Sequence, residues 1–180
     1  DKETGEAITD AEGNEITTSE IFVAEEKDGS IDITFKFDAS ALAGKSLVAF
    51  ETLYTEGKEV AIHADLEDEG QTIRIPEIHT TATDKVTGDH DGVVAKETTV
   101  LDEVFYKNLI PGKEYTVKGT LMVKETGEAL VVNGETVTAE KTFTAEEPDG
   151  SIILEFTFDS SALAGKKIVA FEDITYEGIS

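Results

Sequence analysis

A single carboxamide and a histidine lie close together in a segment dominated by carboxylates. Gln71 is the only glutamine of the 180-residue chain, and His63 precedes it in the stretch GKEVAIHADLEDEGQT. A neutral imidazole can accept a proton near neutral pH, and an amide becomes open to attack once its oxygen is polarised. Composition alone favours an exposed histidine and a surface glutamine, so any chemistry needs partners from elsewhere in the chain.

Three carboxyl groups that follow apolar residues are further candidates. Glu51 and Glu172 each end a VAFE motif, and Asp102 follows an apolar pair in TVLDEVFYKNLIPGKEY. The ordinary role of the glutamates is a solvated strand end, and that of the aspartate is a turn or surface position. Two carboxyl groups forced together in an interior could not both ionise, so one would stay protonated and could donate a hydrogen bond to a developing oxyanion.

Charge and composition argue against several classes of function. The 39 acidic and 15 basic residues give a formal net charge of −24, which disfavours nucleic acid and anionic membrane surfaces. Because the chain has no cysteine, thiolate metal sites are excluded. The segments DAEGNEITTSE (10–20) and TGDHDGV (87–93) have poor metal-ligand spacing, and no motif for a free substrate is present. We therefore expect no cofactor, no metal and no enzyme acting on free substrates.

The sequence repeats itself. Residues 24–51 match residues 145–172 almost throughout, and KETGEA occurs at 2–7 and again at 124–129. Neither copy is whole, because the first lacks the opening part of the second and the second lacks the closing part of the first.

The repeat predicts two domains and a short joint. We place the closing part of repeat 1, without its first strands, at 1–77 and repeat 2, without its last strands, at 78–180. Pro76 in the joint favours an extended connection, as in an array of stacked domains. With no signal peptide and no initiator methionine at Asp1, the sequence is expected to be a fragment of a longer extracellular chain.

Period-two alternation predicts β-strands. SIDITFKFD (30–38) places four apolar side chains on one face, and its twin SIILEFTFD (151–159) does the same. Further strands are expected at 45–54, 114–123 and 135–145, with one short helical turn in each DASALAGK-like segment. The fold class is therefore all-β, with tandem Ig-like or CnaB-like β-sandwich domains of about 7–9 strands per complete module.

Four motifs in this order resemble the VaFE-type Thr–Gln ester-bond domains of Gram-positive surface adhesins. They are TTATD at 80–84, LDEVFYKNLIPGKEY at 101–115, the two VAFE motifs, and HADLEDEGQT at 63–72. The resemblance covers nearly the whole chain. It implies an extracellular, cell-wall-anchored protein in which a threonine hydroxyl on a first strand attacks a glutamine amide on a last strand, ammonia leaves, and an ester remains. This is a single-turnover autocatalytic cross-link rather than enzymatic turnover.

The resemblance assigns a role to each candidate residue. Thr80 would be the nucleophile, with Thr81 as the alternative, and Gln71 would be the electrophile. The helpers would be His63, Asp102 and the glutamates Glu51 and Glu172.

The set is split between the two copies. Copy one holds Glu51, His63 and Gln71, and copy two holds the remaining three. Either the chain is trimmed from an array, or two half-modules complement each other between chains and give a head-to-tail covalent polymer. The expected partners are neighbouring repeats or another copy of the chain, and Thr80 is not expected to react with Gln71 of its own chain.

Two other readings stay open. The chain could be an Ig-like adhesin module whose loops bind an unidentified host ligand without any cross-link. Alternatively, it could carry a pilin-like Lys–Asn isopeptide bond, although its asparagines, Asn14, Asn108 and Asn133, lie on no expected terminal strand.

Overall fold

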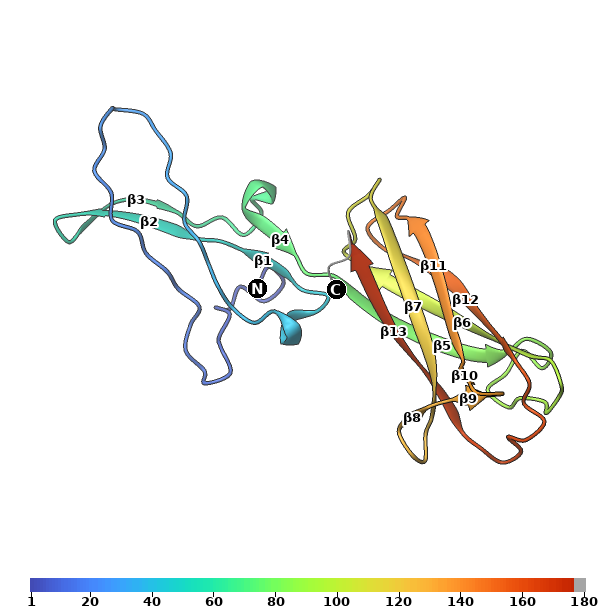
Figure 1. The fold of residues 1–180 in the computed structure, drawn as a ribbon. Coiled ribbons are helices and arrows are strands. Elements are labelled where there is room, and N and C mark those ends of the chain that lie inside the picture. The colour runs from blue at the N-terminus through green and yellow to red at the C-terminus, as the bar shows by residue number, and fades with distance from the viewer. Residues whose placement is uncertain (177–180) are drawn as a thin grey trace. The chain divides into compact units, whose positions relative to one another are not determined.

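The computed structural model describes residues 1–176, which fall into two compact units, Asp1–Ile75 and Pro76–Ser180. Figure 1 shows that the C-terminal unit is built mainly from strands, whereas much of the N-terminal unit is irregular chain. The two short helices that it describes are 3₁₀ helices, η1 (Ser40–Leu42) and η2 (Glu69–Gln71). No helix among the described residues is long and apolar enough to cross a bilayer.

The C-terminal unit is a sandwich of a three-stranded and a four-stranded antiparallel sheet, with a small hairpin at one end. One sheet has the order β12-β6-β5 and the other β11-β7-β13. The strands of the first sheet are β5 (Glu77–Asp84), β6 (Thr98–Lys107) and β12 (Gly150–Phe158). Those of the second are β7 (Glu114–Val123), β11 (Thr138–Thr144) and β13 (Ile168–Tyr176). The short strands are β8 (Glu128–Ala129), which pairs with β7, β9 (Val131–Val132) and β10 (Glu135–Thr136).

The core of this unit follows from the alternation of its strands. Every second side chain of a strand points to the same face of its sheet, so Leu154 and Phe156 of β12 and Val104 of β6 meet Val117 and Leu121 of β7. All five are at most 1% exposed. Burying each of these side chains contributes about 1.5–3 kcal/mol to folding, which makes this unit the firmly packed part of the chain.

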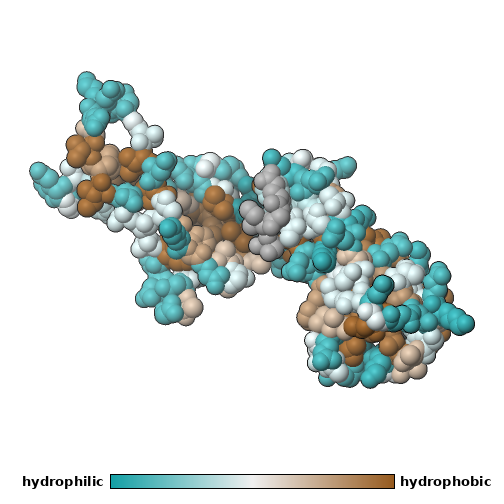
Figure 2. Space-filling view, viewed as in Figure 1, coloured by the Kyte–Doolittle hydropathy of each residue, from teal (hydrophilic) through white to brown (hydrophobic). Residues whose placement is uncertain are grey.

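The N-terminal unit has less regular structure. Strand β1 (Ser46–Val48) pairs with β4 (Thr72–Arg74), and β2 (Glu51–Thr55) pairs with β3 (Lys58–His63), both antiparallel. Among its residues, all of which are described, only two hydrophobic side chains are buried, Leu42 and Leu47. Figure 2 shows brown apolar side chains at its surface, so this unit lacks the layered core of its partner.

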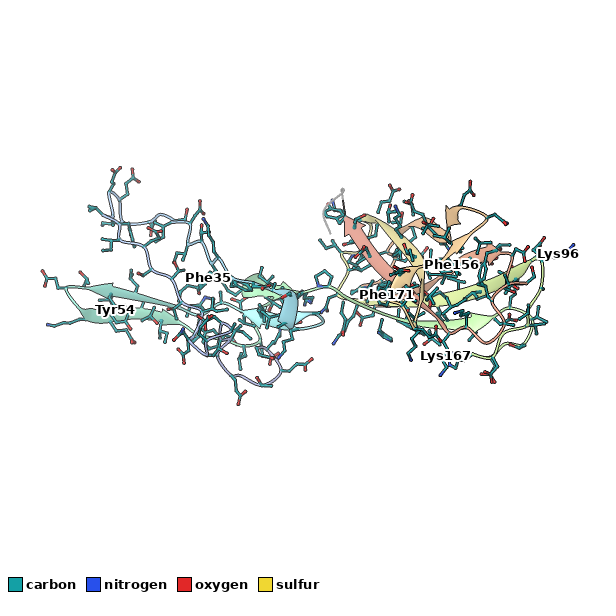
Figure 3. All side chains as sticks on the ribbon, turned by 60° about the horizontal axis from the view of Figure 1, so that its bottom comes forward. Phe35, Tyr54, Lys96, Phe156, Lys167 and Phe171 are labelled. Carbon is teal, nitrogen blue, oxygen red and sulfur yellow. The ribbon has the colours of Figure 1, made fainter. Side chains whose placement is uncertain are left out.

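The prediction of a strand at residues 30–38 is wrong. This segment has no strand in the structure, and Ile31, Ile33, Phe35 and Phe37 are 37–42% exposed. Its twin β12 is a strand because β6 pairs with it along its whole length, and β6 has no equivalent in the N-terminal unit. Phe35 is accordingly 37% exposed, whereas its counterpart Phe156 is fully buried between the sheets (Figure 3).

The remaining expected elements are found with small changes. The strand expected at 114–123 is β7, the one at 45–54 is divided into β1 and β2, and the one at 135–145 contains β10 and β11. The helical turn expected in each DASALAGK-like segment is η1 in the first copy, but in the second copy residues 159–166 form turns without a helix.

Candidate functional site

A threonine hydroxyl meets a glutamate carboxyl between the two sheets of the C-terminal unit. Oγ1 of Thr80, on β5, donates a hydrogen bond to Oε2 of Glu172, on β13, over 3.2 Å. Thr81, the neighbouring residue on β5, points to the opposite face and is exposed. The geometry thus favours Thr80 over Thr81 as the hydroxyl that takes part in any chemistry here.

Asp102 lies beside this pair in the middle of β6. It faces Ala82 of β5 on one side and Leu154 of β12 on the other, and it is 0% exposed. The turn or surface position that composition favours for Asp102 is therefore wrong. Asp102 lies two residues from both Val100 and Val104 on β6, so all three side chains are on the same face of the strand, and both valines pack in the core. Alternation alone could therefore have predicted that Asp102 points inward.

Two carboxyl groups are buried together in this site. Both oxygens of Asp102 and Oε1 of Glu172 are buried without a hydrogen-bond partner in the described part of the chain. Burial raises the pKa of Asp102. Burial, together with the neighbouring Asp102 carboxyl group, raises the pKa of Glu172 to about 8. Because two interacting acids titrate as a unit, the pair retains a proton at neutral pH, and a protonated carboxyl is a hydrogen-bond donor.

Gly119 leaves room for an apolar ring next to this site. Gly119 of β7 lies directly opposite Glu172, and a side chain at that position would come within 2.5 Å of the Phe156 ring. The Phe156 ring therefore occupies the space that a side chain at position 119 would fill. It keeps water away from the carboxyl pair, which maintains the raised pKa.

The other candidates lie on or next to the strands of the N-terminal unit. Glu51 lies opposite His63, and the Ala49 backbone N–H donates to the Gln71 carbonyl over 3.2 Å. Residues two apart on a strand share a face, and so do directly opposed residues. His63 thus lies on the Glu51 side of this ribbon, and Gln71, at the end of η2, lies next to Ala49. Oε2 of Glu51 is buried without a partner in this fully described unit.

An aspartate that sequence reasoning missed orients the histidine. Nε2 of His63 lies 3.0 Å from Oδ2 of Asp68, and Asp68 also accepts a hydrogen bond from the backbone of Gly70 at the start of η2. No sequence pattern marked Asp68, because it is one of many acids in the run DLEDEG. Its proximity to His63 in an acidic run is the only signal that could have identified it.

The internal repeat relates the candidate residues of one unit to those of the other. Glu51 and Glu172 occupy the same position in the two VAFE motifs. Around that glutamate the C-terminal unit supplies Thr80 and Asp102, and the N-terminal unit supplies His63 and Gln71. Each unit therefore holds a different half of the predicted set of site residues.

The two segments considered as metal loops are closed by their own hydrogen bonds. In the first, Asp10 accepts hydrogen bonds from the backbone and the side chain of Asn14. In the second, the backbone N–H of Asp89 donates to Oγ1 of Thr87, and the backbone N–H of His90 donates to Oδ1 of Asp89. Across residues 1–176 there is no group of three or more His, Cys, Asp or Glu side chains that could hold a metal ion.

Two solved structures resemble the chain, both of a bacterial adhesin from Mobiluncus mulieris containing intramolecular disulfide, isopeptide and ester bond cross-links, in two crystal forms. Each is 19% identical and aligns with 57% of this chain, with TM-scores of 0.48 and 0.46. The alignments span 44% and 45% of those chains, less than half of their length. A search of the curated proteins found no match.

The sequence model of one protein family matches the chain twice. The family is described as "T-Q ester bond containing domain", and the matches cover residues 2–75 and 76–179, one in each unit. The chain therefore belongs to the T-Q ester bond containing domain family.

Proposed function

We propose that the chain is a structural stalk repeat of a bacterial surface adhesin whose modules are locked by Thr–Gln ester bonds. The observation that carries this proposal is the contact of the Thr80 hydroxyl with a buried carboxyl pair that retains a proton at neutral pH. The family membership supplies the class of bond. Such a protein belongs on the cell surface, anchored to the wall of a Gram-positive cell.

The residues support a balanced reaction. Oγ of Thr80 attacks the side-chain carbonyl carbon of a glutamine in the position of Gln71, and a histidine in the position of His63 accepts the hydroxyl proton. The protonated carboxyl of the Asp102–Glu172 pair donates a hydrogen bond to the carbonyl oxygen as it becomes negative. The carbon–nitrogen bond then breaks, the nitrogen takes the proton from the imidazolium, and ammonia leaves. One carbon–oxygen bond has replaced one carbon–nitrogen bond, with no cofactor.

Folding speeds this slow reaction by holding the two reacting groups together. A strand pair that holds hydroxyl and amide in contact reaches effective concentrations of about 10⁵–10⁸ M in well-oriented cases. Because neither unit holds the full set, the reaction needs a closing hairpin equivalent to residues 56–75 beside β13. A neighbouring module of an array or a second chain would supply it.

The ester explains how a chain without cysteine could withstand pulling. A covalent tie between the first and last strands of a sandwich stops the sheets from separating when force is applied to the chain ends. It also restricts the unfolded ensemble in the way a disulfide does, and unlike a disulfide it forms without an oxidant. These properties suit a stalk that holds a binding tip away from the cell.

An extended chain tests the ester directly. Replacing residues 177–180 with a second copy of residues 56–75 would append a closing hairpin to β13, beginning with the same Glu-Gly pair. We expect the intact mass of this chain to fall short of its sequence mass by about 17 Da, the mass of one ammonia. The variant Thr80→Ala should keep its full sequence mass, and the control Thr81→Ala should still lose ammonia. A full sequence mass for the extended chain with Thr80 intact would refute the proposal.

A further inference from the structure

One edge of the second sheet is unoccupied in the C-terminal unit. Strand β13 pairs with β7 along one side, and no strand within residues 1–176 pairs with its other side. A shallow groove of about 650 Å³ follows these two strands, with Met122 and the 62% exposed Phe171 among its lining residues (Figure 3). Such an edge presents free backbone N–H and C=O groups and is a template for an added strand.

The N-terminal unit shows which segment covers the equivalent edge. There, residues 46–55, the counterpart of β13, pair antiparallel with residues 58–74. Transferred to β13 by the repeat, this register sets Gln71 opposite Ala170 and His63 opposite Glu172. Both side chains would then lie on the face of β13 that carries Glu172, where Thr80 already contacts it.

The first strand of the covering segment, β3, is weakly held where it now lies, whereas the end of the segment is fixed by the pairing of β4 with β1 and by ion pairs of Glu69 with Lys2 and Arg74. Every residue of β3 is exposed, and so are the last four of β2. Val60 and Ile62 are 55% and 60% exposed. An isolated two-stranded ribbon is marginally stable in water, whereas a strand added to a sheet that covers a core is not. Moving this segment from its own ribbon to β13 would therefore place it on a better-packed sheet.

We propose that the β13 edge is the docking site for residues 56–75 of a second copy of this chain. Within residues 1–176, each molecule then has one segment to donate and one edge that can accept it. This heterologous contact closes into a ring or continues as an open chain of molecules. The docking needs only strand pairing, while the ester that would follow rests on the proposed function. In that step the hydroxyl oxygen of the acceptor's Thr80 replaces the amide nitrogen of the donor's Gln71, and ammonia leaves.

Two isoleucines of similar exposure provide a matched test. Ile73 is 61% exposed and Ile62 is 60% exposed, so a charge at either costs the single molecule little. After docking, Ile73 would lie opposite Ile168, which packs against the core, whereas Ile62 would lie opposite Asp173 on the outer face. We expect Ile73→Lys to weaken self-association by about tenfold or more because it would bury a charge. Ile62→Lys should leave self-association nearly unchanged.

The experiment measures the mass of the 180-residue chain in solution over a range of protein concentrations, by light scattering and native mass spectrometry. We expect multimers that a synthetic peptide of residues 56–75 dissociates. A chain that stays monomeric at every concentration would overturn the inference. So would multimers that the peptide does not dissociate, or that both lysine variants weaken equally, because another surface would then hold them together.

The variant Gln71→Ala separates docking from chemistry. It should still form multimers in native conditions, but it should show none of the covalent ladder expected for the parent chain on a denaturing gel. If the extended chain loses ammonia while the 180-residue chain stays monomeric, docking is wrong and the ester function stands. If multimers form but the extended chain keeps its full sequence mass, the ester function is wrong and docking stands.

Discussion

Asp102 and Glu172 form one titrating unit that folding creates. The C-terminal unit must take two carboxyl groups out of water beside each other, which disfavours ionisation of both. This costs stability at neutral pH, and the cost is accepted at a place where a neutral acid is chemically useful. The same pair is therefore expected to control both the reactivity of Thr80 and the pH dependence of folding.

The raised pKa of Glu172 sets the direction of that dependence. In the folded unit its pKa is about 8, against an ordinary value of 4.5. Between these values the unfolded chain has lost a proton that the folded unit keeps, so the free energy of unfolding falls as pH rises from about 4.5 to about 8, and it levels off above that. The full stability contribution of this group is present only at acidic pH.

Replacing this acid with a neutral isostere should remove the dependence. We expect Glu172→Gln to match the parent chain in thermal unfolding at pH 4.5 and to exceed it at pH 8.5. Each kcal/mol is worth about 4–8 °C in a domain of this size. Circular dichroism melts across this pH range would measure it, with Glu140→Gln on the exposed side of β11 as control. Parallel pH profiles for the parent chain and Glu172→Gln would contradict the shared-proton description.

The candidate residues differ in how far the sequence could identify them. The VAFE motifs and the lone glutamine pointed to Glu51, Glu172 and Gln71, because their neighbours and their rarity set them apart. The depth of Asp102 depends on which strands flank β6, and that information is spread over the whole unit. Asp68 was missed since local composition does not distinguish one acid of an acidic loop from the next.

At the scale of elements, one sequence block adopts two structures. Residues 30–38 and 151–159 have the same alternation, yet only the second block forms a strand, β12. Alternation predicts which face of a strand would be buried, but a strand also needs a neighbour for its hydrogen bonds. Period-two patterning placed β7 at its observed bounds because β11 and β13 flank it.

Alanine substitutions at two equivalent phenylalanines would measure how differently this block is packed in the two copies. Phe156→Ala should destabilise the C-terminal unit by about 3–5 kcal/mol, as expected for a large cavity in a packed core. Phe35→Ala, at the equivalent position of the other copy, should change the free energy of unfolding by less than about 0.5 kcal/mol. Urea denaturation of both variants would measure this. Equal losses would mean that residues 30–38 are packed after all.

At the scale of the whole molecule, charge opposes the association of copies. Each chain carries a formal net charge of −24, and like-charged molecules repel over distances that salt shortens, with a Debye length of about 10 Å at 0.1 M. Strand exchange must therefore occur against a long-range barrier. This barrier keeps dilute molecules apart at low ionic strength.

Salt should accordingly speed the formation of multimers. Raising sodium chloride from about 0.05 M to about 0.5 M should increase the association rate severalfold, because screening weakens the repulsion between encountering chains. Light scattering after dilution into each salt concentration would follow the rate. The loss of ammonia by the extended chain brings no second molecule into contact, so its rate should respond much less. Association that slows with salt would contradict the electrostatic account.

The two copies of AEE-DGSI also have a consequence for how antibodies would see the protein. The segment is exposed and free of pairing at 24–31, whereas at 145–152 it leads into a strand that β6 holds by backbone hydrogen bonds. A serum raised against this linear peptide should therefore recognise the native chain chiefly through its first copy. The amount of serum that binds would therefore measure how many N-terminal units present this unpaired segment.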